Sequence, residues 1–298
     1  MRVTLITPTL NAAPFLPEML ASVSAQQWAD VEHLAIDGGS TDQTLDLLHA
    51  DPRVTVVSDP GLGLYAALNR GVALATGDVI GFVNADDVLA GEALVTLMTA
   101  LKDDPGSSIA SGGGLVFASD PDGTTRVVAR MNGSGVKRLR EQDVTHGVPM
   151  LNARLYRRSL LDAIGPFDTR WPRCPDHELL LRLVDARPRT TAVDDVVYHY
   201  RAHAQSLTFR GGIERELVEE ILAMCRVRLA ETVTDPGLNR RFRHWHTWGR
   251  AYLAMSDARD RDLRGALREL GRGLATDPLL PLVVPIQIAQ HLRMRAQR

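Results

Sequence analysis

Two adjacent carboxylates follow an apolar segment in the first third of the chain. The stretch Val79–Asn84 has the pattern of a buried strand, and Asp86 and Asp87 come directly after it. Because two negative charges this close repel one another, they favour a bound cation. Hard divalent cations prefer oxygen ligands, and Mg²⁺ or Mn²⁺ bound in this way commonly takes substrate phosphate oxygens as well. The pair therefore predicts a metal ion that neutralises a departing diphosphate.

Three other predicted strands also end in polar residues. These ends are Thr7-Pro8-Thr9-Leu10-Asn11, Asp37-Gly38-Gly39-Ser40-Thr41-Asp42 and Ser58-Asp59-Pro60-Gly61. Asp and Gly form turns and helix caps in many proteins, so each end taken alone has a structural explanation. In a doubly wound parallel sheet, however, ligands bind beyond the carboxyl ends of the strands. Four such ends in one chain predict a polar binding crevice.

Short β-branched runs alternate with helical patterns through residues 3–111. Strands are predicted at Val3–Ile6, Val31–Asp37, Val54–Ser58 and Val79–Asn84, and helices at Phe15–Gln26, Asp42–Ala50, Leu64–Ala75 and Glu92–Leu101. Ser40 followed by Gln43 is a capping-box pattern for the start of the second helix. The alternation predicts an α/β fold in which helices flank a mostly parallel sheet.

The pattern changes after residue 111. A hairpin is predicted from Leu115–Ala118 and Thr125–Ala129, helices at Arg157–Ile164 and Asp176–Ala186, and a last strand at Val196–Tyr200. Gly112-Gly113-Gly114 is interpreted as a flexible bend, because it neither opens a helix nor precedes a lysine. Beyond Gly212 the chain is helical and contains the pattern of one packed helical hairpin. We predict one domain at 1–211 and a C-terminal helical region at 212–298.

The bulk composition is that of an ordinary globular protein. The 298 residues are 45% hydrophobic and 23% charged, with a net charge of −2, so no nucleic-acid partner is expected. Cys174 and Cys225 lie far apart, which excludes a disulfide framework and argues against a zinc site. The N-terminal residues lack the apolar core of a signal peptide. We expect a cytoplasmic location.

The C-terminal region is basic. From Arg240 onward, twelve arginines stand against five acidic residues. The apolar run Leu279–Ile288 is too short to span a bilayer and is interrupted by Pro281 and Pro285. Two interpretations stay open for this tail. It lies at the inner face of a membrane with its arginines near anionic headgroups, or it packs against the first domain or a second subunit in a homodimer.

Taken together, the motifs resemble those of family 2 glycosyltransferases, which have the GT-A fold. The resemblance covers about residues 2–210 and is carried, in order, by Thr7–Asn11, Ile36–Asp42, Gly63–Tyr65, Asn69–Gly71, Phe82–Asp87, Gly165–Asp168, Asp176–Arg182 and Tyr200–His203 with Ser206. It implies inverting transfer of a sugar from a nucleotide-sugar donor, with a UDP-sugar expected, to a hydroxyl of a glycan or lipid-linked acceptor. Surface polysaccharide or glycolipid biosynthesis is the implied setting.

The resemblance also implies roles for individual residues. Asp176 would be the general base, while Asp87 and His203 would hold Mg²⁺ or Mn²⁺. The residues implied in nucleotide-sugar binding are Pro8, Thr9, Asn11, Asp37, Asp59, Asn69, Asn84 and Asp86. Asp37 would contact the base, and the nucleotide-sugar half would span about 1–111, with the acceptor half at about 112–211.

Two departures from the family pattern affect these assignments. Asn84 stands where the metal motif usually begins with Asp, so the number of carboxylate ligands stays open. Pro175 precedes Asp176 where the family often has Glu, which leaves Glu178 as an alternative base.

Two other functions are compatible with an acidic crevice on an α/β sheet. A sugar nucleotidyltransferase would need basic residues in an early Gly-rich loop, yet no Lys or Arg occurs between Arg2 and Arg53. A non-catalytic carbohydrate-binding or scaffold protein would not need Asp37, Asp87 and Asp176 together. Both alternatives are therefore less favoured than transfer.

Overall fold

The computed structural model describes residues 1–119, 124–131, 139, 144, 150–203, 215–231 and 235–278. The chain divides into two compact units, Met1–Ser206 and Leu207–Arg298. The hairpin turn predicted at 120–123, the boundary predicted at 211/212 and the apolar run at 279–288 all lie outside the described residues. The predicted domain boundaries stay predictions.

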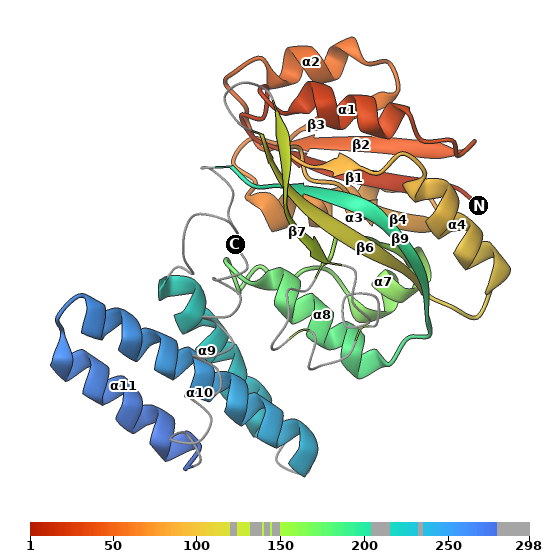
Figure 1. The fold of residues 1–298 in the computed structure, drawn as a ribbon. Coiled ribbons are helices and arrows are strands. Elements are labelled where there is room, and N and C mark those ends of the chain that lie inside the picture. Colours follow the sequence, from red (N-terminus) through yellow and green to blue (C-terminus); the bar gives the residue numbers. More distant parts are fainter. Residues whose placement is uncertain are drawn as a thin grey trace. The chain divides into compact units, whose positions relative to one another are not determined.

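The first half of the N-terminal unit is a parallel sheet covered by helices (Figure 1). Its strands are β1 (Val3–Thr9), β2 (Val31–Asp37), β3 (Val54–Ser58) and β4 (Val79–Phe82), in the order β3-β2-β1-β4. The helices between and after them are α1 (Leu16–Ser24), α2 (Thr44–Ala50), α3 (Leu64–Leu74) and α4 (Ala93–Asp103). Every residue of β1 is buried, as expected for a strand covered on both faces. The predicted α/β class is confirmed.

The second half of this unit extends the same sheet with mixed pairings. Its elements are β5 (Val88–Leu89), β6 (Ile109–Ser119), β7 (Thr125–Met131), β8 (Arg154–Arg157), α7 (Arg158–Ile164), α8 (Pro175–Ala186) and β9 (Thr190–Arg201). β8 pairs antiparallel with β4 and β6, β6 pairs parallel with β9, and β7 forms the predicted hairpin with β6. β9 also pairs with β5, which brings the residues after β4 beside the end of β9.

Two local predictions are wrong. Gly112-Gly113-Gly114 is not a bend but the interior of β6, where a Cβ on Gly112 would lie 2.6 Å from a methyl carbon of Val197. Glycine is required there by close packing. The capping box is also absent, because α2 begins only at Thr44, whose N–H donates to the carboxylate of Asp42. Ser40 instead accepts a hydrogen bond from the backbone of Asn11.

The C-terminal unit is helical in its described part. It contains α9 (Arg215–Glu231), α10 (Pro236–Arg259) and α11 (Leu263–Thr276). Asp235 caps α10 by accepting from the N–H groups of Gly237 and Leu238, as a residue at this position should. α10 and α11 pack together as the predicted hairpin. Over the described ranges, no helix combines the length and apolar character needed to cross a bilayer.

Candidate active site

The loops after β1 and β2 are joined through side chains that were predicted to bind the nucleotide. Asn11 has a left-handed backbone, with φ of 50°, and its side-chain oxygen accepts from the N–H of Thr41 at 2.9 Å. Asp37 is fully buried, and its carboxylate accepts from the N–H groups of Gly39 and Ser40 at 3.0 and 2.8 Å. These bonds shape the loop beyond β2 before any ligand binds. A base contact by Asp37 stays a prediction.

The other residues predicted on this side fall into two groups. Pro8 and Thr9 are buried within β1, and the Thr9 hydroxyl lies 3.5 Å from an Asp37 carboxylate oxygen. Asp59 is about half exposed, and its carboxylate lies 3.7 Å from the Arg70 guanidinium. The carboxylate of Asp59 is therefore accessible to solvent, whereas Thr9 is buried and contacts Asp37.

Asp87 is held by three internal donors. One carboxylate oxygen accepts from the Tyr198 hydroxyl at 2.9 Å and the Asn84 amide at 3.0 Å, and the other accepts from the N–H of Arg201 at 2.8 Å. The side chain is buried. Burial and the neighbouring charge of Asp86 raise the pKa of Asp87 to about 7, although the three hydrogen bonds oppose that rise. Asp87 therefore joins the end of β4 to β9.

Asp86 faces a histidine. Its carboxylate oxygen lies 2.9 Å from Nε2 of His203, and its side chain is 33% exposed, so it keeps access to solvent. The His203 ring stacks against Phe15, with centroids 4.4 Å apart. One oxygen ligand and one imidazole nitrogen are thus held side by side at the end of the sheet.

Arg201 ties this corner together. Its Nε donates to the backbone carbonyl of Asp86 at 2.9 Å, and its guanidinium forms an ion pair with Glu18 of α1. The guanidinium carbon lies 4.5 Å from the centroid of the Phe117 ring, a cation–π contact. The side chain of Arg201 is only 7% exposed. It acts as a fixed support for the loop that carries both carboxylates.

The residues present fit a divalent cation that shares its shell with a substrate. No group of three or more His, Cys, Asp and Glu side chains gathers for a metal within the residues the structure describes. Asp86 and His203 together supply two ligand atoms. Mg²⁺ typically binds through one or two carboxylates plus substrate phosphates, so a small protein contribution is compatible with this ion. Both carboxylate oxygens of Asp87 already accept hydrogen bonds from neighbouring residues of the chain.

Asp176 occupies the first turn of α8, which begins at Pro175. Its carboxylate accepts from the N–H of His177 at 2.9 Å, lies 3.3 Å from the His177 ring nitrogen and accepts from the Tyr65 hydroxyl. Burial raises the pKa of Asp176, but the contacts with His177 and Tyr65 outweigh it, so the pKa is lowered. A helix N-terminus also favours a carboxylate. Asp176 is therefore ionised at neutral pH and able to accept a proton.

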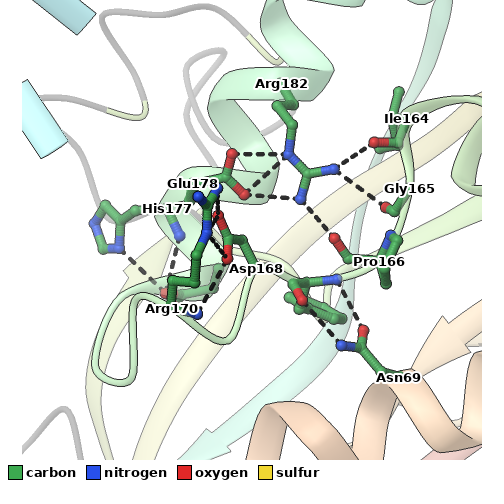
Figure 2. A network of polar contacts seen from close by, with 11 residues as sticks. Asn69, Ile164, Gly165, Pro166, Asp168, Arg170, His177, Glu178 and Arg182 are labelled. Atoms are coloured by element: carbon green, nitrogen blue, oxygen red, sulfur yellow. Dashed lines mark hydrogen bonds and ion pairs between the residues drawn. The ribbon is translucent and has the colours of Figure 1, made fainter. Parts of the chain in front are cut away.

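Glu178, the alternative base, is engaged with Arg182. The guanidinium donates to both carboxylate oxygens of Glu178, at 2.7 to 2.9 Å, as Figure 2 shows. The other face of Arg182 donates to the carbonyls of the turn Ile164–Pro166. Glu178 is thus part of a clamp that fastens α8 to this turn. Asp176, two residues earlier, pairs with His177 and forms no ion pair with an arginine within the residues that the structure describes.

The same turn is fastened from the opposite side by Asn69 of α3. The Asn69 amide donates to the carbonyl of Phe167 at 2.9 Å, and its oxygen accepts from the N–H of Phe167 at 2.8 Å (Figure 2). Both polar groups of Asn69 are used in this contact. Its predicted role in nucleotide-sugar binding stays untested, whereas its role in holding the turn is plain.

Sequence reasoning assigned no role to Tyr65, Arg182, Tyr198 or Arg201. Three of them lie within quoted motifs, and Tyr198 lies two residues before one. They could have been noticed as Arg and Tyr side chains within otherwise apolar strand and helix patterns. Buried polar side chains need hydrogen-bond partners, so such residues indicate polar contacts. For Tyr198 and Arg201 the partner Asp87 is far away in the sequence, by 111 and 114 residues, whereas Arg182 pairs with Glu178 only four residues away.

Sequence comparison identifies related proteins. The model of the family described as "Glycosyl transferase family 2" matches residues 4–165. A PGL/p-HBAD biosynthesis glycosyltransferase of Mycobacterium tuberculosis is 32% identical over 187 residues, covering 60% of this chain and 68% of the relative. The O-antigen biosynthesis protein RfbC of Myxococcus xanthus is 29% identical over 217 residues, covering 70% of this chain and 16% of that protein.

Solved structures share the fold. S. aureus TarS 1-349 in complex with UDP-GlcNAc superposes with a TM-score of 0.68 at 17% identity, covering 100% of this chain and 88% of the other. The mannosyltransferase PcManGT from Pyrobaculum calidifontis, in complex with GDP-Man and Mn²⁺, gives a TM-score of 0.58 at 21% identity, with coverages of 99% and 84%. At these identities the likeness concerns the fold.

Proposed function

The chain belongs to glycosyltransferase family 2, and from that premise we propose that it transfers a sugar, with inversion, from a nucleoside diphosphate sugar to an acceptor hydroxyl. In this reaction the hydroxyl attacks from the face opposite the leaving diphosphate. A carboxylate on the attacking side removes the hydroxyl proton, which is worth about 10²–10⁴-fold in rate. Asp176 is the proposed base, because it is partly exposed and held in its ionised form.

The contact between Asp176 and Tyr65 carries this proposal. Tyr65 lies in the first turn of α3, which follows the carboxyl end of β3. The carboxyl ends of β1, β2, β3 and β4 share one edge because these strands are parallel. The proposed base thus belongs to the edge at which Asp37, Asp59 and Asp86 also lie. Ligands of α/β sheets bind at that edge.

We propose Asp86 and His203, rather than Asp87, as the protein groups that hold Mg²⁺ or Mn²⁺. Their side chains are partly exposed, and an ion would replace the single 2.9 Å contact between Asp86 and His203, whereas both oxygens of Asp87 accept internal hydrogen bonds. When bound, the ion supplies positive charge to the departing diphosphate. Asp87 then positions its neighbour. The presence of Mn²⁺ with GDP-Man in the related mannosyltransferase structure supports this cofactor.

The donor class and the biosynthetic setting follow from the relatives. A UDP-sugar is the proposed donor, since TarS is seen with UDP-GlcNAc. The acceptor is proposed to be a glycan or a lipid-linked molecule, because the sequence relatives are named for glycolipid and O-antigen biosynthesis. The transfer site is proposed to lie in the N-terminal unit, within the predicted domain 1–211.

Donor hydrolysis provides the first test. The full chain is incubated with UDP-glucose, UDP-GlcNAc or GDP-mannose, and release of the nucleoside diphosphate is followed with Mn²⁺ and with EDTA. We expect slow, Mn²⁺-dependent release from one donor, and stabilisation of the protein by the matching nucleotide, since a ligand that binds only the native state raises the free energy of unfolding. Formation of a nucleoside triphosphate and a sugar 1-phosphate when pyrophosphate is added would instead favour a nucleotidyltransferase. Binding of no sugar nucleotide would overturn the proposal.

A further inference from the structure

α11 exposes three of its four leucines and packs mainly through small residues. The face packed in the C-terminal unit consists of Gly265, Ala266, Glu269 and Gly273. On the outside, Leu263 and Leu267 are 67% and 70% exposed, and Leu274 is 43% exposed. An amphipathic helix of a globular protein normally places its leucines against the core. This arrangement leaves a Leu stripe beside the packed face, formed by the exposed Leu263, Leu267 and Leu274 together with the half-buried Leu270.

The spacing of the stripe makes it continuous. Its members are four, three and four residues apart, which places them on one side of a helix with 3.6 residues per turn. α11 packs principally against α10, and α10 in turn packs against α9, so α11 is the outer helix of its unit (Figure 1). Contiguous exposed apolar surface of this kind marks a site for a protein or membrane partner.

Arginines line one flank of the stripe. Arg264 and Arg268 are each one residue beyond a stripe leucine and lie one turn apart, and both are exposed. Neither forms an ion pair or a side-chain hydrogen bond with any part of the chain that the structure describes. Their charge is available to an external partner.

The acidic residues of this region are largely used inside the unit. Asp257 pairs with Arg215, Glu269 pairs with Arg250 and Arg272, and Asp277 lies near His244. Asp262 caps α11 by accepting from the N–H of Gly265. Asp257, Glu269 and Asp277 are buried, whereas Asp260 and Asp262 are exposed before the first turn of α11. Along the helix itself, the exposed charges beside the leucines are those of Arg264 and Arg268. A partner that complements this face is apolar with an anionic border.

We propose that α11 docks this enzyme on an anionic lipid surface, with the Leu stripe in the acyl boundary and Arg264 and Arg268 at the headgroups. An amphipathic helix with an apolar stripe and a basic flank lies in the plane of the membrane interface in this way. Antiparallel pairing of two copies through the stripe would place the arginines of one copy against those of the other, so lipid is favoured over self-association. The proposal rests on α11 and not on the apolar run Leu279–Ile288, which lies outside the described residues.

Vesicle co-sedimentation of the full chain tests the proposal. We expect binding to phosphatidylcholine vesicles that contain phosphatidylglycerol, weaker binding at high salt and little binding to phosphatidylcholine alone. The double variant Leu263→Gln/Leu267→Gln should lose binding at least about tenfold, and glutamine keeps a high helix propensity. Arg264→Glu/Arg268→Glu should weaken binding by about fivefold or more for each charge changed.

The matched control is Val127→Gln, because Val127 of β7 is 52% exposed but lies in the N-terminal unit. It should bind vesicles as the unmodified chain does. All three variants change exposed side chains, and circular dichroism checks that each keeps its helix content. Donor hydrolysis is measured in parallel without lipid, so loss of docking and failure of the proposed transfer are distinguishable.

Three outcomes would overturn docking on lipid. The unmodified chain shows no preference for anionic vesicles, or the leucine variant binds them as well as Val127→Gln does. In the third outcome, analytical ultracentrifugation shows a dimer that the leucine variant converts to monomer without any change in vesicle binding. That result would assign the Leu stripe to self-association.

Discussion

Two pairs of carboxylates, Asp86 with Asp87 and Asp176 with Glu178, are built in the same way. In each pair one member is taken up by internal donors, namely Asp87 at the end of β4 and Glu178 in α8. The other member is partly exposed and touches a histidine, at 2.9 Å for Asp86 and 3.3 Å for Asp176. One carboxylate thus shapes the local backbone while its neighbour stays available for chemistry.

The pairs differ in how the internal member is held. Asp87 is buried among the Tyr198 hydroxyl, the Asn84 amide and a backbone N–H, and none of these carries a charge. Glu178 instead faces the guanidinium of Arg182. The difference teaches that a buried carboxylate held by neutral donors keeps a raised pKa, whereas the partly buried Glu178 is held by the opposite charge of Arg182.

The largest expected effect is on the base. Asp176→Asn should lower the transfer rate about 10²–10⁴-fold, because no carboxylate remains to accept the proton. Nucleotide affinity, measured by calorimetry, should be nearly unchanged. Glu178→Gln is the matched variant and should lower the rate by less, since it removes only the clamp on Arg182. A greater loss in Glu178→Gln would reverse the roles within this pair.

The next largest effect is on activation by Mn²⁺, and it distinguishes Asp86 from Asp87. Asp86→Asn should weaken the affinity for Mn²⁺ about 100-fold, because it removes a proposed ligand. Changes to groups that only support a metal ligand lower metal affinity by about 10–100-fold. Asp87→Asn should weaken it less and lower the free energy of unfolding, since Asp87 accepts three internal hydrogen bonds. Titration of the activity with Mn²⁺ measures both. If Asp87→Asn lowers the affinity for Mn²⁺ more than Asp86→Asn does, Asp87 is the metal ligand, as the sequence predicted.

A smaller effect is expected from Asn69, which connects the two regions through the turn at Phe167. Asn69→Ala should lower the free energy of unfolding by about 1–3 kcal/mol, because it leaves the N–H and carbonyl of Phe167 without their partner. Asn69→Asp keeps the acceptor for the N–H and should cost less. Urea unfolding and nucleotide calorimetry are compared. Intact stability with a loss of nucleotide affinity would support the predicted role of Asn69 in donor binding.

The last expected effect concerns the pH dependence of stability. The pKa of Asp87 is raised from 3.8 to about 7. Between these two pH values the folded chain therefore keeps the proton on Asp87, whereas the unfolded chain has released it. The contribution of Asp87 to stability is therefore greatest below about pH 4 and falls as the pH rises towards 7. Urea midpoints of the EDTA-treated protein should show this fall, and Asp87→Asn should flatten it. Parallel pH curves for both proteins would contradict burial as the cause of the raised pKa.

Local patterns were sufficient for most of the elements. The runs at 31–37 and 54–58 were predicted with the observed bounds, because β-branched residues favour strands. The triple glycine at Gly112 was misjudged as a bend, since its cause is the distant side chain of Val197. Likewise, the capping box at Ser40 failed because a contact with Asn11 competes for that hydroxyl.

The sequence by itself determined the fold class, the family and the candidate residues, because motif order and hydrophobic period are properties of neighbouring residues. Only the tertiary structure decided which of the carboxylates accept hydrogen bonds from internal donors. Asp87 is occupied because β9 brings Tyr198 and Arg201 to the end of β4, and this pairing joins residues more than 100 positions apart. Hydrogen-bond partners of a buried charge depend on distance in space, so no local pattern in the sequence reveals which of two adjacent aspartates is free to bind.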